Sequence, residues 1–262
     1  MSRKNGVLNH WGRALLAISA LSMLGALGVR AGRNPTEHKI HDKERPHPPA
    51  VEARPTLTEP PSDAIVLFDG ESLSEWESMD GSEPGWKVED GNIVIELGTG
   101  HIRTKRRFGD CQLHIEWATK DPLGDKKYPG NSGVFFGPYE VQVLANHGED
   151  NRIYADGMAG AIYGQYPPLA NACREPGAWQ SFDIIYRRPR FDEGGNLEKP
   201  ATMTVFHNGV LVQDCETLTG PTAHERRPAY KPHGKVHIRL QEHSCVLHFR
   251  NIWARPLEAG KR

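Results

Sequence analysis

Much of this sequence is a succession of short segments in which apolar and polar residues alternate. In residues 111–117, Leu113, Ile115 and Trp117 fall on one face and polar residues lie between them. The same period recurs in residues 236–240. A period of two is that of a β-strand with one buried face, so each such segment is expected to contribute a strand to a sheet.

Turn-forming dipeptides separate these segments. Asp90-Gly91 and Asn208-Gly209 each lie between two apolar runs, which is the pattern of a β-hairpin. Apart from the N-terminal apolar run, no segment shows a convincing helical period. The sequence therefore predicts an all-β fold, a jelly-roll β-sandwich of two antiparallel sheets. Strands are expected at residues 64–68, 86–89, 93–95, 111–117, 134–136, 139–144, 182–186, 203–206, 210–212, 236–240 and 246–253.

The N-terminus has the layout of a secretory signal peptide. Three basic residues and no acidic ones precede a 16-residue apolar run at residues 14–29. Val29 and Ala31 are small residues at the −3 and −1 positions of a cleavage site. We therefore expect residues 1–31 to be removed after Ala31 and the protein to be exported to the periplasm or beyond, with no other membrane segment. The alternative is an uncleaved anchor, for which the run is short.

A proline-rich segment follows the expected signal peptide. Residues 32–62 contain seven prolines and few apolar side chains, so we expect a disordered linker. The globular domain then occupies residues 63–257, and residues 258–262 form a C-terminal tail. The histidines of the linker are expected to be solvated rather than to bind metal: His38, His41 and His47.

Charge and cysteine content exclude some classes of protein. There are 32 Lys and Arg against 33 Asp and Glu, which excludes a nucleic-acid-binding protein that relies on neutralising phosphates. No CxxC spacing occurs, so a zinc ribbon is not expected. The four cysteines allow three disulfide pairings, or they remain free buried thiols. They are Cys111, Cys173, Cys215 and Cys245.

Several expected strands carry ionisable or amide side chains opposite their apolar face. Histidine, glutamine, glutamate and arginine recur there, whereas lysine is scarce. If these strands are neighbours, the side chains converge on one face that could perform acid–base chemistry and bind an oxyanion. If they are not, the faces are plain solvent surface. The residues are His114, Glu116, Glu140, Gln142, His237, Arg239, Gln241, His243, His248 and Arg250.

An ordered set of motifs over residues 63–257 resembles the 3-keto-disaccharide hydrolase domain family. The resemblance implies an exported bacterial domain with a concanavalin-A-like or laminin-G-like jelly roll. The Glu-x-Asp-x-x-Glu run of family-sixteen β-glucanases is absent, so their two-carboxylate mechanism is not expected. The motifs are Leu67-Phe-Asp-Gly, Trp86-Lys-Val-Glu-Asp-Gly, Asn131-Ser-Gly-Val-Phe-Phe, Tyr139-Glu-Val-Gln-Val, Gly160-Ala-Ile-Tyr, Gly177-Ala-Trp-Gln, Leu240-Gln-Glu-His and Phe249-Arg-Asn-Ile-Trp.

The resemblance implies cleavage of a glycoside that a separate dehydrogenase has first oxidised at carbon 3. A ketone at C3 acidifies the hydrogen on C2, so a general base can form an enediolate. The enediolate then expels the C1 substituent, and addition of water completes a net hydrolysis. Such an enzyme needs a base, an acid for the leaving oxygen and donors or a divalent metal ion for the enediolate oxygens. Hydrolase and lyase share the first step, so both remain open.

The predicted roles follow from these needs. Glu140 is the expected base or metal ligand, because it shares a polar strand face with Gln142. His243 is the expected proton shuttle or imidazole ligand of a metal ion, and Glu116 is a second catalytic carboxylate. Substrate-binding roles are expected for Gln142, Gln241, Arg239, Arg250 and Asn131, of which Arg250 would steady developing negative charge.

Two non-enzymatic interpretations compete with this one. The first is a non-catalytic carbohydrate-binding module of the cell envelope, because the same sandwich serves lectins. The second is a structural envelope domain. The clustered histidine and glutamate favour an enzyme, since a lectin face relies more on aromatic and amide groups. The tryptophans are expected in the core rather than as sugar platforms: Trp76, Trp86, Trp179 and Trp253.

Overall fold

The computed structural model describes residues 36–47, 59–119, 130–148 and 153–257. The expected signal peptide and C-terminal tail lie outside these residues. In the described part of the chain the only helix is the single 3-10 turn η1 (Ala155–Gly157), and no helix is long and apolar enough to cross a membrane. The expected all-β sandwich of two antiparallel sheets is confirmed.

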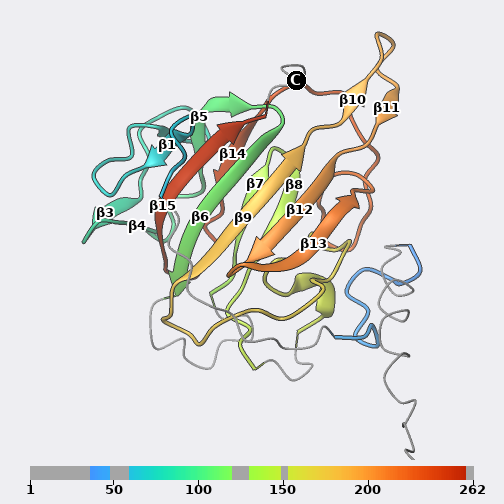
Figure 1. The fold of residues 1–262 in the computed structure, drawn as a ribbon, viewed down its shortest axis with the longest axis horizontal. Helices are drawn as coiled ribbons and strands as arrows, with labels where there is room; N and C mark the ends of the chain where they lie inside the picture. Colours follow the sequence, from blue (N-terminus) through green and yellow to red (C-terminus); the bar gives the residue numbers. More distant parts are fainter. Residues whose placement is uncertain (1–35, 48–58, 120–129, 149–152, 258–262) are drawn as a thin grey trace, which may run out of the picture.

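The larger sheet has eight strands. They are β13 (Val210–Thr217), β12 (Thr202–His207), β9 (Gln180–Arg187), β6 (Cys111–Thr119), β15 (Leu247–Pro256), β4 (Asn92–Val94), β3 (Lys87–Glu89) and β1 (Ile65–Phe68). The first seven follow one another in that order, and β1 pairs with β15 beside this path. Figure 1 shows β15, β6, β9, β12 and β13 side by side in one layer, with β7 and β8 in the layer behind them.

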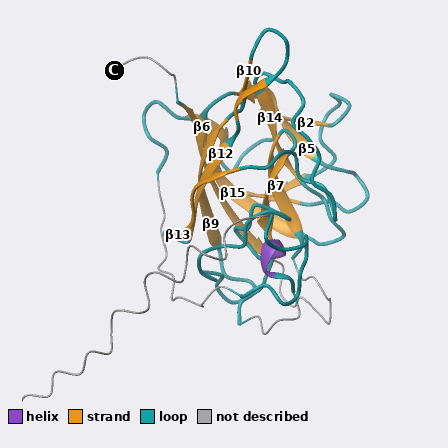
Figure 2. Cartoon of the chain, turned by 90° about the vertical axis from the view of Figure 1, so that its right-hand side faces the viewer, coloured by secondary structure: helices purple, strands orange, loops and turns teal. Residues whose placement is uncertain are grey.

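The smaller sheet has five strands and carries the candidate site. In spatial order they are β2 (Trp76–Ser78), β5 (Ile102–Phe108), β14 (Val236–Leu240), β7 (Ser132–Phe136) and β8 (Tyr139–Val143). A separate short hairpin pairs β10 (Arg190–Phe191) with β11 (Leu197–Lys199). Turned by 90°, the molecule shows the two layers and the short helix toward one end of the sandwich (Figure 2).

One hydrophobic cluster fills the space between the sheets. It includes Leu113 and Ile115 from β6 and Val134, Val141 and Ile238 from the smaller sheet. The alternation therefore predicts the buried face of these strands correctly. The expected hairpins also form, because their turn residues have positive φ: Asp90 (50°), Gly91 (74°), Asn208 (52°) and Gly209 (77°).

Residues 36–47 differ from the disordered linker expected there, because they pack against the domain. Arg45 is only 1% exposed and its Nη1 donates a hydrogen bond to the carbonyl of Gln165 (3.1 Å). Arg227 in turn donates to the carbonyl of His38 (3.2 Å). Polar contacts hold this segment, and these cannot be predicted from its low content of apolar residues.

The four cysteines are free thiols. Cys111, Cys173 and Cys245 are buried, and Cys215 is exposed. Of the three pairings open to the sequence, none forms in the structure.

Candidate functional site

A polar cavity of about 750 Å³ lies on the outer face of the smaller sheet, opposite the core. Its floor comes from β7 and β8, and its walls come from loops and from residues 36–47. The lining residues are His41, Lys43, Asn131, Phe135, Glu140, Gln142, Tyr154, Tyr163, Thr222, His224, Glu225, Gln241 and His243.

Cross-strand pairing places a carboxylate, an aromatic ring and a guanidinium in one row. Glu140 on β8 pairs with Phe135 on β7, and Phe135 pairs with Arg239 on β14. The Arg239 guanidinium carbon lies 3.8 Å from the centroid of the Phe135 ring. Gly133 leaves room for this row, because a Cβ there would lie 2.5 Å from Oε1 of Glu140. The sheet register thus sets the spacing of the two charged groups.

Glu140 sits in a desolvated position. It is 5% exposed, and within the described residues no side chain donates a hydrogen bond to its carboxylate. Burial raises the pKa of Glu140 to about 8, against the opposing effect of the Arg239 charge. A carboxyl group that changes protonation state near neutral pH is suited to general acid–base catalysis.

Amide groups lie beside this carboxyl. Gln142 Nε2 donates hydrogen bonds to Asn131 Oδ1 (2.9 Å) and to the carbonyl of Val143 (3.0 Å). Gln241 is held through its backbone, which donates to the carbonyl of Gly133 (3.1 Å). The side-chain amides of Gln142 and Asn131, which these contacts hold, can bind sugar hydroxyls without reordering.

The structure brings five of the eight predicted site residues to the cavity: Asn131, Glu140, Gln142, Gln241 and His243. Arg239 lies beside it on the Phe135 ring and lines a second cavity of about 260 Å³. That smaller cavity is lined mainly by basic side chains of β5, β14 and the residue before β14.

Glu116 and Arg250 are not part of this site, and grouping them with Glu140 was wrong. They lie on β6 and β15, which belong to the larger sheet. Glu116 Oε2 accepts a hydrogen bond from Arg250 Nε (2.7 Å), and Oε1 accepts one from Asn251 (2.9 Å). The guanidinium of Arg250 stacks on Trp179 at 3.9 Å. Alternation reveals which residues share a face of one strand, but not which sheet the strand joins.

The tryptophans behave largely as expected. Trp76, Trp86 and Trp253 are buried, and Trp179 is partly buried. None of the four lines the cavity.

The cavity walls carry residues that no sequence pattern predicts to be part of the site. His41, Tyr154, Tyr163 and His224 lie in segments without strand periodicity. Only Tyr163 had a signal, since it ends the Gly160-Ala-Ile-Tyr motif. His41 lies within residues 32–62, where a linker with solvated histidines is expected.

The described side chains do not form a divalent-metal site. No group of three or more His, Cys, Asp or Glu side chains in the described ranges is arranged to hold a metal ion. Glu140 and His243 therefore lack a third ligand of this kind among those residues.

The site combines a buried carboxyl with amide side chains on the outer face of a β-sandwich, an arrangement suited to binding carbohydrate. Residues 63–255 match the sequence profile of the 3-keto-alpha-glucoside-1,2-lyase-like domain, and the chain belongs to this family. The resemblance stated from the motifs is thereby confirmed. Among curated proteins, none is significantly similar in sequence.

Solved structures agree with this assignment. A protein of Parabacteroides distasonis ATCC 8503, whose glycosyl hydrolase name is provisional, is 44% identical with a TM-score of 0.73, over 81% of this chain and 93% of that one. Two others from the same organism, also provisionally named, show the shared fold. They are 19% and 22% identical, with TM-scores of 0.54 and 0.53, over 75% and 74% of this chain and 94% and 99% of theirs.

Proposed function

We propose that this protein cleaves glucosides that carry a ketone at C3, by eliminating the substituent at C1. The observation that carries the proposal is the buried carboxyl of Glu140, with a pKa of about 8, between fixed amides and the Arg239 charge. Such a group can accept a carbon-bound proton near neutral pH and return it afterwards.

The proposed first step breaks the C2–H bond. Glu140 takes the proton, and the electron pair forms an enediolate whose negative charge rests on the C3 oxygen. Arg239 and the amide N–H of Asn131 stabilise that charge, and Gln142 orients the Asn131 amide by donating to its Oδ1. The C3 carbonyl then re-forms, a C1–C2 double bond appears, and the C1–O bond breaks as an imidazole of the cavity protonates the leaving oxygen. Water added across the double bond makes the net reaction a hydrolysis.

Export belongs to the same proposal. The signal-like residues 1–31 support action in the periplasm or outside the cell, on a substrate that a separate dehydrogenase supplies.

The test is the Glu140→Gln variant, which keeps the shape of the side chain and removes the base. Exchange of the C2 hydrogen of methyl 3-keto-α-glucoside in D2O and release of methanol are both followed by NMR. Both rates should fall about 100-fold or more. A folded Glu140→Gln protein with full rates would refute the role of Glu140.

The unoxidised glucoside is the matched substrate control, since its C2 hydrogen is not acidic. If the unsubstituted protein binds the keto-sugar but neither exchanges nor cleaves it, the chain is a carbohydrate-binding module instead.

A further inference from the structure

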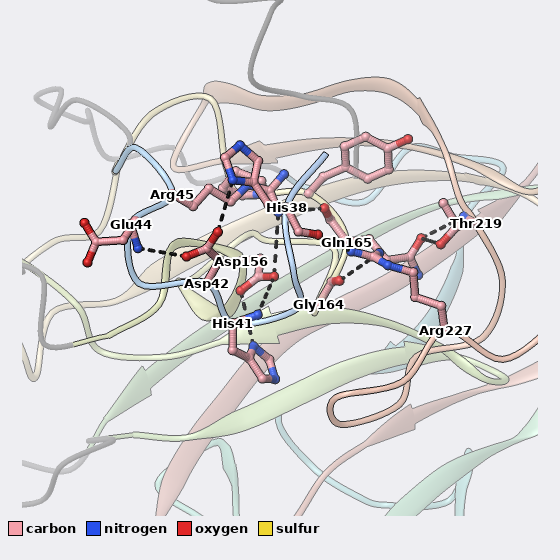
Figure 3. Close-up of polar contacts among 12 residues, drawn as sticks. His38, His41, Asp42, Glu44, Arg45, Asp156, Gly164, Gln165, Thr219 and Arg227 are labelled. Carbon is pink, nitrogen blue, oxygen red and sulfur yellow. Dashed lines mark hydrogen bonds and ion pairs between the residues drawn. The ribbon is translucent and has the colours of Figure 1, made fainter. Parts of the chain in front are cut away.

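Residues 36–47 form one wall of the cavity, although they precede the range matched by the family profile. Figure 3 shows them lying across η1 and the 164–165 turn, with the side chains of His41 and Arg45 directed at Asp156. Arg45 Nη1 lies 3.7 Å from Asp156 Oδ2, and both residues are 1% exposed. A buried ion pair therefore fixes this segment against the domain.

The same carboxylate holds His41. Asp156 Oδ2 accepts a hydrogen bond from the His41 backbone (3.2 Å), and Oδ1 lies 3.2 Å from ring Nδ1. The ring also packs on Tyr154, with 3.8 Å between ring centroids. The backbone hydrogen bond, the ring hydrogen bond and the ring contact orient the imidazole, with Nδ1–H donating to Asp156 and Nε2 facing away from it.

The imidazole of His224 extends this hydrogen-bonded series from His41 toward solvent. His41 Nε2 lies 3.3 Å from His224 Nδ1, and both side chains line the cavity. His41 is 7% exposed, whereas His224 is 67% exposed. The series Asp156, His41, His224 thus runs from a buried carboxylate past the cavity to solvent.

We propose that His41 is the acid that protonates the leaving oxygen, oriented by Asp156 and recharged from solvent through His224. This inference rests on the proposed function and assigns its second proton transfer to the segment before the family domain. Glu140 gains the C2 proton and His41 gives its Nε2 proton to the C1 oxygen as the C1–O bond breaks, so the enzyme's net charge does not change. For this transfer the C1 oxygen takes the place of the exposed His224 ring beside Nε2. Glu140 then releases its proton to water, and His41 regains one through His224.

His243 is the competing imidazole. It also lines the cavity, but it is exposed, and no described residue hydrogen-bonds to its ring or orients it. A general acid must be held in a fixed orientation toward the substrate atom that accepts its proton. Of the two imidazoles, only that of His41 is held in this way by described residues, so the geometry favours His41.

The experiment separates the two proton transfers. In His41→Gln, C2 hydrogen exchange of methyl 3-keto-α-glucoside in D2O should stay within a few-fold of the unsubstituted chain, because Glu140 is intact. Release of methanol should fall about 100-fold. With 4-nitrophenyl 3-keto-α-glucoside the loss should be far smaller, because 4-nitrophenolate leaves without a proton. Added imidazole should restore part of the methanol release in His41→Ala.

His38→Gln is the matched control. It removes a histidine of the same segment whose ring pairs with Asp42 (3.3 Å) and does not line the cavity, so both rates should be unchanged.

Each other outcome has a definite meaning. Unchanged methanol release in His41→Gln overturns the assignment. Equal loss of exchange and of both leaving groups also overturns it, because His41 would then only shape the cavity. If the unsubstituted chain neither exchanges nor cleaves, it is the proposed function that fails.

Discussion

At the scale of single residues, burial of the Glu140 carboxyl opposes stability and supports chemistry. The folded state holds this proton up to a pKa of about 8, whereas an ordinary glutamate releases it at 4.5. Between these pH values the unfolded chain binds fewer protons at this group, so its contribution to stability falls as the pH rises. The Glu140→Gln variant is therefore expected to be more thermostable than the natural chain at pH 9 and not at pH 4.

The charge of Arg239 also influences the protonation of Glu140, and this influence should be visible in the pH dependence of C2 exchange. Only ionised Glu140 accepts the C2 proton, so the exchange rate should rise with pH through about 8. The Arg239 charge lowers the pKa of Glu140. In Arg239→Gln the rise of the exchange rate, the rising limb of the pH profile, should therefore move to higher pH, and the plateau rate should fall. The measurement is C2 exchange between pH 6 and 10.

Arg103→Gln is the control for this profile. Arg103 lies one strand farther from Glu140 and pairs with Glu77 (2.8 Å), so its removal should move the limb less. A profile that shifts equally in both variants would mean that Arg239 acts only through general surface charge.

At the scale of elements, a bulge in β15 builds a charged network on the outer face of the larger sheet. The register of β15 against β6 shifts between Arg250 and Trp253, and Asn251 has φ 45° there. The bulge places Asn251 and Arg250 on Glu116. His114, fully buried under Trp253, reaches Asp183 through Nδ1 (2.8 Å).

This network should stabilise the fold within a defined pH window. Burial alone lowers the pKa of His114, but hydrogen bonds to Asp183 and Glu116 raise it to about 9. Burial alone raises the pKa of Glu116, but donors bring it down to about 2. The His114 contribution is complete below pH 6.5 and is lost as the pH rises through 9. The Glu116 contribution is complete above pH 4.5 and is lost as the pH falls through 2.

Glu116→Gln should therefore lower the free energy of unfolding most near pH 5.5, by about 3 kcal/mol, and less at pH 9.5. Urea unfolding at the two pH values measures the difference. C2 exchange should be unaffected, because the network lies on the other sheet. An equal loss of stability at both pH values, or loss of exchange, would contradict this account.

Strand patterns predicted more of the fold than of the site. A period of two identified β6, β8 and β14 together with their polar faces, and it placed Glu140 beside Gln142. It missed β5, because its three buried residues, Ile102, Thr104 and Phe108, are separated by mostly basic ones. It could not assign strands to sheets, which is why Glu116 was expected at the wrong face.

At the scale of the whole molecule, the site is assembled from distant parts of the chain. His41 and Glu140 are brought together by contacts between segments that no local pattern relates. The floor of the cavity comes from paired strands of the smaller sheet, whereas the wall at residues 36–47 is held mainly by polar contacts. Sequence periodicity reports local burial. It therefore identifies the strands that form the floor of the cavity, but not residues 36–47 that form one wall.

Because the core and the residue 36–47 wall are held by different contacts, removal of residues 1–47 should affect them differently. The hydrophobic core draws its residues from 67 to 254 and none from residues 36–47, so the shortened chain should still unfold cooperatively. Asp156 loses the contacts with both Arg45 and His41, and the loss of these contacts should lower the melting temperature by several degrees. C2 exchange should persist because Glu140, Phe135 and Arg239 remain, while methanol release should fall to the level of His41→Gln. Asp156→Asn in the shortened chain should recover much of the lost stability and none of the cleavage, because it removes the carboxylate charge without restoring an acid. Full cleavage by the shortened chain would show that the family domain alone carries the complete site.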